Sequence, residues 1–257
     1  MTRRAIAHLP WFWGTVGIVG PVVVWQLVCA LFAVPTYLLP SPWATLTALW
    51  ADAAILGPHL ATTAIEAFSG LALAVVFGVA VAVAMSTSRS SRDLLYPPLV
   101  LSQAVPLIAV APLVLIWFGL GPSSKVLIVA FVCFFPITVN AYEGFRTVDP
   151  LYLELLRTFG AQRRDVYRHL YMPATLPGIL AGLRVGATYS VLGAVVGEWL
   201  GGSRGLGVYM IRALQSFRTD RLFAAIWIVM LMSLAMFKLV DGVGGRLTPW
   251  LRRRQRA

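Results

Sequence analysis

VDPLYLELLRTFGAQRRDVYRHLYMPATLPG, residues 148–178, is a charged stretch that separates two long apolar runs of the chain. Asp149-Pro150 predicts the start of a helix, because an acidic N-cap followed by proline at the first helical position is typical of helix N-termini. Leucines then recur at helical spacing, and Gly160 is predicted to end this helix. A second short helix is predicted from Ala161, with Met172-Pro173 as its stop.

The two predicted helices are amphipathic and too charged to insert into lipid. Leu151, Leu155 and Leu156 form the apolar side of the first helix, and Val166 and Leu170 that of the second. Two interpretations are open from the helical pattern alone. The apolar sides rest on the membrane surface or on the protein's own helices, or they fill a groove in a partner protein.

The apolar runs around this stretch place the chain in the membrane. Of 257 residues, 59% are hydrophobic and 12% charged, which is more apolar content than a soluble core of this size buries. About 20 apolar residues cross a bilayer as a helix, so we expect an all-α integral membrane protein with about six transmembrane helices. The candidate spans are 11–32, 64–85, 97–117, 124–141, 175–199 and 222–241. Four prolines interrupt the third candidate and predict a kink or a re-entrant break there.

The basic residues set the expected orientation. The net charge of +11 does not indicate nucleic-acid binding, because the arginines lie between apolar runs and at the chain ends. Six spans put both termini on one side, and the positive-inside rule favours the cytoplasm for that side. The outside loop 200–221 is an exception, since it carries several arginines. Either this loop forms a short surface or re-entrant helix, or its charge has a role of its own.

The spacing within residues 143–175 resembles the cytoplasmic "EAA" loop of ABC importer permeases. That loop reads Glu-Ala-Ala, three residues, Gly, nine residues, then Ile-x-Leu-Pro. Here Glu154-Leu155-Leu156 is followed by three residues, Gly160, nine residues and Leu170-Tyr171-Met172-Pro173. Apolar residues replace the alanines, the isoleucine and the leucine of the motif. The resemblance covers most of the chain and looks closest to the nitrate, sulfonate and taurine group.

The resemblance implies a type I ABC importer permease fold with a cytoplasmic two-helix coupling loop. Glu154 and Gly160 would shape a turn that docks on an ABC ATP-binding subunit, and the apolar residues Leu155, Leu156, Leu170, Met172 and Pro173 would fill its cleft. ATP would be bound by that subunit, so no cofactor is expected on this chain. An extracytoplasmic solute-binding protein and a second permease copy, as a homodimer, would be the other partners in the bacterial inner membrane. Nitrate, sulfonates, taurine and pyrimidine or vitamin precursors are carried by relatives, and we favour a small organic solute.

These expectations divide the chain into consecutive parts. A cytoplasmic tail is predicted for residues 1–10, and the first span with an outside segment for 11–59. The transporter core is predicted for 60–243, including the coupling loop at 143–175, and a basic cytoplasmic tail for 244–257.

Small residues recur every four positions in the second and fifth candidate spans. This spacing lets helix backbones approach closely in lipid, so these faces are predicted to pack against protein. The glycines in the two ladders are Gly70 and Gly78, and Gly178, Gly182 and Gly186. Each ladder has an acid in line with it, Glu66 in the second span and Glu198 in the fifth.

Both acids are expected at the outer ends of their helices. We hypothesise that Glu66 and Glu198 lie near the outer mouth of the pathway or on the docking surface for the binding protein. The alternative is that each ends a helix at the interface, paired with water or a neighbouring arginine. Gln103, Asn140 and Trp199 are further pathway candidates, with interhelical hydrogen bonds or an interfacial tryptophan as the alternative.

The sequence lacks the motifs of other membrane-protein classes. It has no phosphate-binding G-x-x-x-x-G-K-[ST] loop and no His, Cys or carboxylate cluster with metal-ligand or hydrolytic spacing. An ATP-independent secondary transporter is the alternative function, although two related halves and midplane ionisable residues are not seen. A membrane-embedded enzyme is a third possibility that the missing site chemistry disfavours.

Overall fold

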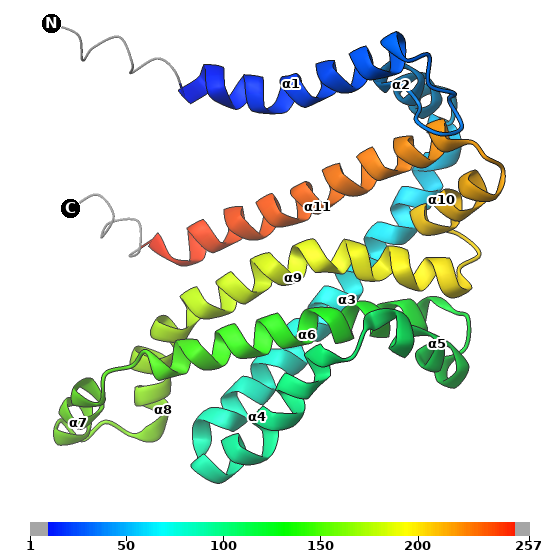
Figure 1. The fold of residues 1–257 in the computed structure, drawn as a ribbon. Helices are drawn as coiled ribbons and strands as arrows, with labels where there is room; N and C mark the ends of the chain where they lie inside the picture. The colour runs from blue at the N-terminus through cyan, green and yellow to red at the C-terminus, as the bar shows by residue number, and fades with distance from the viewer. Residues whose placement is uncertain (1–9, 250–257) are drawn as a thin grey trace, which may run out of the picture. The chain divides into compact units, whose positions relative to one another are not determined.

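The computed structural model describes residues 10–249, and all regular structure in that range is helical (Figure 1). The predicted tails fall mostly outside it, since residues 1–9 and 250–257 are not described. The helices are α1 (Pro10–Leu31), α2 (Pro42–Ala51), α3 (Ala53–Thr87), α4 (Arg89–Ala104), α5 (Leu107–Phe118), α6 (Pro122–Arg146), α7 (Pro150–Thr158), α8 (Arg163–Val166), the π-helix η1 (Tyr167–Tyr171), α9 (Met172–Gly201), α10 (Leu206–Gln215) and α11 (Thr219–Leu247).

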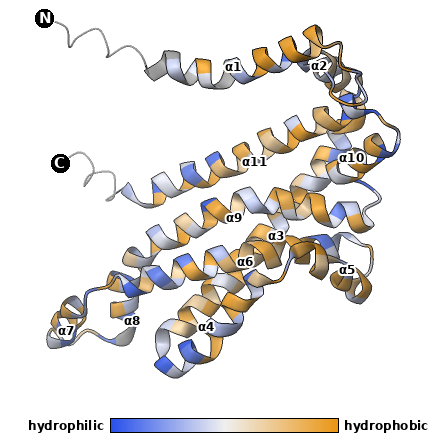
Figure 2. Cartoon of the chain, in the orientation of Figure 1, coloured by the Kyte–Doolittle hydropathy of each residue, from blue (hydrophilic) through white to orange (hydrophobic). Residues whose placement is uncertain are grey.

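Within residues 10–249, four helices are long and apolar enough to cross a membrane: α3, α6, α11 and the continuous helix Arg164–Gly201 that contains α9. Helices α4 and α5 pass the same test as a bent pair and would make a fifth span. Helix α1 adds a shorter apolar stretch, Thr15–Leu31. The expected all-α membrane fold is therefore confirmed, with hydrophobic residues along the long helices and polar ones toward their ends (Figure 2).

The third candidate span, 97–117, is broken as its prolines predict. Helices α4 and α5 meet at an angle of 104°. Val105 and Pro106 both have extended backbone conformations at the break. The ring of Pro106 disfavours the helical conformation at the preceding residue, Val105, which explains why the helix stops at Ala104.

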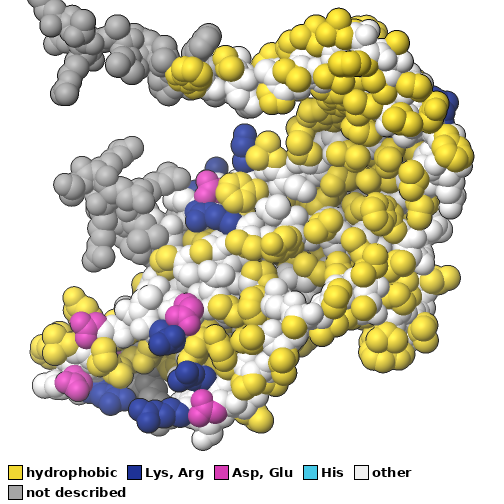
Figure 3. All heavy atoms as spheres, viewed as in Figure 1, with side chains coloured by type: hydrophobic (Ala, Val, Ile, Leu, Met, Phe, Trp, Pro, Cys, Tyr) yellow, Lys and Arg dark blue, Asp and Glu magenta, His cyan; other side chains and the backbone are white. Residues whose placement is uncertain are grey.

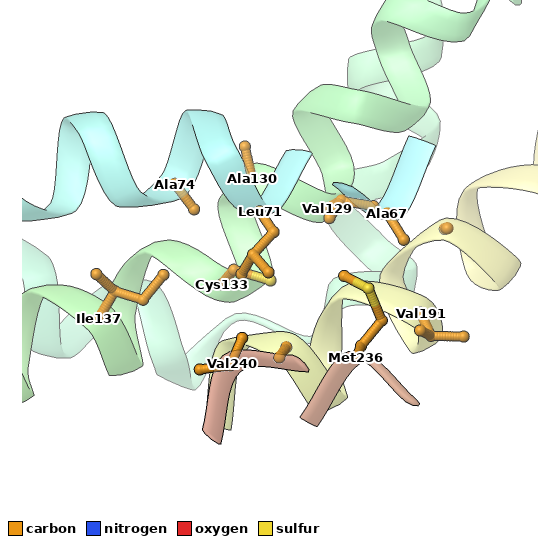
Figure 4. Packing of buried hydrophobic residues seen from close by; sticks show 12 residues of the cluster. Ala67, Leu71, Ala74, Val129, Ala130, Cys133, Ile137, Val191, Met236 and Val240 are labelled. Atoms are coloured by element: carbon orange, nitrogen blue, oxygen red, sulfur yellow. The ribbon is translucent and has the colours of Figure 1, made fainter. Parts of the chain in front are cut away.

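The described residues fold as two compact units, 10–58 with 209–228, and 59–208 with 229–249. The larger unit has a core made by four helices, in which side chains from α3, α6, α9 and α11 meet (Figure 4). Its members are mostly small or branched: Ala67, Leu71, Ala74, Val129, Ala130, Cys133, Ile137, Ala187, Val191, Ala194, Met236 and Val240. Small side chains let the helix backbones approach closely, which is how membrane helices gain van der Waals contact.

Helices α6 and α9 pack with their backbones close together. A Cβ atom on Gly178 would lie 2.4 Å from the carbonyl oxygen of Asn140, and one on Gly182 would lie 2.6 Å from that of Pro136. The remaining ladder glycines, Gly70, Gly78 and Gly186, also lie against α6. Both ladders therefore face protein rather than lipid.

Replacing Gly182 with valine should destabilise the α6–α9 pair. The added carbons meet backbone atoms, which cannot rotate away, so we expect a loss of about 1–3 kcal/mol of stability. Thermal unfolding of the purified protein in detergent measures the effect. Gly242→Val is the matched control, because a Cβ there meets nothing within 4 Å. Equal unfolding temperatures for the two variants would contradict the assigned contact.

The smaller unit contains a buried polar network around Asp52. The Tyr209 hydroxyl donates to Asp52 Oδ2 at 2.6 Å, and Arg221 Nε lies 3.0 Å from the same oxygen. Burial and the hydrogen bond to Asp52 raise the pKa of Tyr209, so its hydroxyl stays protonated as a donor. Arg218 pairs with Asp220 at 2.8 Å. Of the two alternatives for the basic loop 200–221, a short helix is present as α10, and ion pairs account for two of the loop's arginines.

Candidate functional site

The 143–175 segment joins the end of α6 to the start of α9. Asp149 caps α7 by accepting a hydrogen bond from the Leu151 N–H at 2.9 Å, and Pro150 occupies the first turn. The predicted helix start is therefore confirmed. Its physical basis is that the aspartate satisfies an N–H that has no partner inside the helix.

Gly160 ends α7 as predicted. Its φ is +76°, in the left-handed region that L residues with a side chain rarely adopt. The Gly160 N–H donates to Arg157 O at 2.9 Å, and the Ala161 N–H donates to Leu156 O at 3.0 Å. This pair of hydrogen bonds is the Schellman motif, which satisfies the last carbonyl groups of a helix and turns the chain.

The second predicted helix does not stop at Met172-Pro173, so this part of the prediction is wrong. Helix α8 passes through η1 directly into α9, and the whole forms one helix, Arg164–Gly201. In η1 the Met172 N–H bonds to Tyr167 O, five residues earlier. The wider π turn lies where the proline ring would otherwise clash with a carbonyl four residues back, so the helix continues past Pro173.

The apolar residues of this segment are largely open to solvent. None of the α7 side chains is buried. The most exposed are Leu151 (68%), Tyr152 (58%), Leu155 (52%), Phe159 (78%) and Met172 (69%). Glu154 is exposed, and Leu156, Leu170 and Pro173 are half-buried. Figure 3 shows charged side chains gathered beside hydrophobic ones over the end that carries α7 and α8. An uncovered apolar surface of this kind, rimmed by charge, is typical of an interaction site.

The opposite ends of α6 and α9 carry a buried polar network centred on Glu198. Only 1% of Glu198 is exposed. Its carboxylate accepts hydrogen bonds from Thr63 Oγ1 and from the Gly207 N–H, both at 2.6 Å. Gly205 has a φ of +133°, and a Cβ there would lie 2.1 Å from the Glu198 carboxyl carbon. Glu198 therefore fixes the α9–α10 loop, and the interpretation that it ends a helix beside water or arginine is wrong.

Helix α3 also hydrogen-bonds to this loop, through His59 and Thr63, which were not predicted from the sequence. The Gly205 N–H donates to His59 Nδ1 at 2.9 Å, and the Leu206 N–H donates to Thr63 Oγ1 at 2.8 Å. His59, Thr63 and Glu66 lie at positions i, i+4 and i+7 of α3. That spacing puts polar groups on one face of a membrane helix and could have identified the network.

Lys125 is also part of the network, although nothing in its sequence surroundings indicated this. It is 3% exposed. Its ammonium group donates to the Gly201 carbonyl at 2.8 Å and to the Gly121 carbonyl at 3.1 Å, and it also bonds the Leu120 carbonyl. A cation at the end of α9 interacts favourably with the helix dipole and satisfies carbonyl groups there.

Glu66 lies beside Glu198 and Lys125 and is 4% exposed. Its carboxyl group contacts that of Glu198, and its Oε2 accepts no hydrogen bond from a donor in the described part of the chain. Glu66 also lines a pocket of about 430 Å³. The pocket residues are Thr62, Glu66, Leu120, Pro122, Lys125, Gly202, Ser203 and Arg204.

The other pathway candidates, Gln103, Asn140 and Trp199, come from three different helices, and Arg184 is a further charged residue of α9. Gln103 is exposed near the end of α4. Asn140 Nδ2 donates to Pro136 O at 2.7 Å within α6, at the contact with α9. Trp199 is 42% exposed. Arg184 pairs with Asp241 of α11 at 2.7 Å, so its charge is compensated within the bundle.

Comparisons with known proteins agree with this architecture. The family described as "Binding-protein-dependent transport system inner membrane component" matches residues 74–253. The formylaminopyrimidine transport permease protein ThiX of Halalkalibacterium halodurans is 37% identical over 229 residues, which cover 89% of this chain and 91% of that protein. The taurine transport system permease protein TauC of Escherichia coli is 32% identical over 234 residues, which cover 88% and 85%.

A solved structure of the MetNI methionine ABC transporter in inward-facing conformations matches with a TM-score of 0.53 and 18% identity. The match covers 80% of this chain and 98% of that chain, and it supports the type I importer permease fold. The relatives favour a permease over an ATP-independent secondary transporter. The chain belongs to the binding-protein-dependent transport system inner membrane component family and is a permease subunit of an ABC importer.

Proposed function

We propose that the 143–175 segment couples this permease to an ATP-binding subunit on the cytoplasmic side. The observation that carries the proposal is the exposed apolar surface of α7, which ends in the left-handed turn at Gly160. A short helix with an uncovered apolar face fits a groove in a partner. Helix Arg164–Gly201 leads from this segment through the membrane without a break, so movement of the docked end is transmitted along a stiff element.

The proposal includes an orientation and an assembly. Both termini are cytoplasmic, because that arrangement puts most arginines inside. ATP is bound and hydrolysed by the partner subunit, and this chain carries no cofactor. Two permease copies form a homodimer in the bacterial inner membrane, which presents two coupling segments to two ATP-binding subunits about a two-fold axis.

The pocket at Glu66 would then face the outside, where a solute-binding protein delivers its cargo. Glu66, Glu198 and Trp199 lie at that end, and Gln103 and Asn140 are assigned to the pathway between the two ends. Glu66 Oε2 has no donor among the described residues, so a solute N–H or a water molecule would satisfy it. The relatives are named for taurine and formylaminopyrimidine, and we propose a small organic solute of the sulfonate, taurine or pyrimidine-precursor kind.

Replacing Leu155 with aspartate tests the docking surface. Burying a leucine contributes about 1.5–3 kcal/mol, so we expect at least about a tenfold drop in the ATP-binding subunit that co-purifies with the tagged permease in mild detergent. Leu214→Asp is the matched control, because Leu214 is similarly exposed (55%) but lies on α10. Unchanged recovery of the ATP-binding subunit with Leu155→Asp would remove α7 from the docking surface.

A further inference from the structure

A second pocket, of about 390 Å³, lies at the end of the larger unit that carries the 143–175 segment. Four elements converge on it: the end of α3, the first turn of α4, the end of α6 and the last residue of η1. The lining residues are Met85, Ser86, Thr87, Ser88, Arg89, Arg92, Tyr142, Phe145, Arg146 and Tyr171. This pocket is separate from the α7 surface and from the Glu198 network.

The pocket is strongly basic. Arg89 and Arg92 come from the first turn of α4, and Arg146 comes from the last turn of α6, so arginines of two helices line the same pocket. None of the described residues that line it is acidic. Arg146 pairs with Glu143 outside the lining at 3.1 Å, and no ion pair within residues 10–249 involves Arg89 or Arg92. The pocket therefore holds positive charge that the described residues only partly compensate.

The pocket lining also includes apolar and aromatic residues. Met85 is buried at the end of α3, and the rings of Phe145 and Tyr171 pack with their centroids 6.0 Å apart. Ser88 caps α4 by accepting from the Ser91 N–H at 3.0 Å. A lining that combines arginines with apolar and aromatic residues suits a ligand with an anionic head and a less polar body.

We propose that this pocket binds a phosphate group, carried by an anionic lipid headgroup or by a soluble phosphate compound. A guanidinium group can donate two parallel hydrogen bonds to two oxygens of one phosphate. Several arginines together therefore bind a phosphate group more strongly than a single charge does. Basic pockets between membrane helices at the cytoplasmic surface are suited to phospholipid headgroups. The assignment to the cytoplasmic leaflet rests on the proposed orientation, whereas phosphate binding itself does not.

The test measures binding directly with the full-length permease. The protein is placed in phosphatidylcholine nanodiscs, and affinity is measured for fluorescent phosphatidylglycerol and, separately, for inorganic phosphate. Each arginine near an anionic surface contributes about 1 kcal/mol, so Arg89→Gln with Arg92→Gln should weaken binding at least about tenfold. The control pair, Arg164→Gln with Arg246→Gln, removes two exposed arginines outside the pocket lining.

The outcomes separate the ligand sources. Loss of phosphatidylglycerol binding only in the Arg89/Arg92 pair supports a lipid headgroup, and the same pattern with inorganic phosphate supports a soluble ligand. Equal losses of affinity in both double variants would mean that the anion binds to general surface charge, and would overturn the proposal. Failure of the unmodified protein to bind either anion would overturn it as well. Unchanged thermal unfolding of the variants shows that the fold is intact. These results do not depend on transport, so they stand whether or not the docking of α7 is correct.

Discussion

Gly160→Val is expected to reduce ATP-driven uptake by the assembled transporter to background while the permease still inserts into the membrane. With φ at +76°, an L residue at this position costs about 1–2 kcal/mol, and a β-branched one costs more. The chain would relieve this strain by losing the hydrogen bonds that Gly160 and Ala161 donate to the end of α7. The orientation of α7 would then change, and α7 would no longer dock on the ATP-binding subunit. Uptake of radiolabelled solute into proteoliposomes measures the effect.

Gly160→Asn is the control for backbone strain, since asparagine tolerates the left-handed conformation. A Cβ at Gly160 meets nothing within 4 Å in the permease itself. If Gly160→Asn transports and Gly160→Val does not, the backbone conformation is the cause. If both fail, the partner subunit leaves no room for a side chain there. Normal uptake by Gly160→Val would refute the coupling role of this turn.

Local signals in the sequence were enough to predict much of this region. The N-cap at Asp149 and the left-handed glycine at Gly160 depend on neighbouring residues, so they could be read from the chain directly. The long apolar runs likewise predicted membrane helices, because hydrocarbon leaves few other structures for the backbone. The proline-induced break before α5 follows from the same local restrictions on the backbone.

Other features depended on contacts that are distant in the sequence. The stop predicted at Met172-Pro173 was wrong because η1 accommodates the proline, and a π turn has no simple sequence signal. The Glu198 network joins residues of α3, α6 and the α9–α10 loop. The Lys125 ammonium group donates to backbone carbonyl groups, which every residue carries. No sequence pattern could therefore predict these hydrogen bonds. Only the helical spacing of the polar residues His59, Thr63 and Glu66 indicated a buried polar network.

Glu198→Ala should destabilise the larger unit strongly. The substitution removes the acceptor for Thr63 Oγ1 and for the Gly207 N–H, and both groups are buried. Thr63 Oγ1 also lies 3.1 Å from His59 O and keeps that acceptor, whereas the Gly207 N–H is left unpaired. A buried donor without a partner costs about 1–3 kcal/mol, and we expect a loss of stability of that size. Lys125 also loses a nearby opposite charge. Thermal unfolding in detergent should show a clearly lower transition temperature than that of the unmodified protein.

Two variants decide whether the acceptor oxygens of Glu198 are the cause. Glu198→Gln keeps the size of the side chain and one acceptor oxygen, but its amide NH₂ faces a group that also donates. The loss of stability should therefore be smaller for Glu198→Gln than for Glu198→Ala. Glu154→Ala makes the same truncation at an exposed acid of α7 and should leave unfolding unchanged. If Glu198→Ala unfolds at the same temperature as Glu154→Ala, the carboxylate does not hold the α9–α10 loop. A graded order, with Glu154→Ala most stable and Glu198→Ala least, would show that two buried hydrogen bonds to one carboxylate fix the end of the bundle opposite the 143–175 segment.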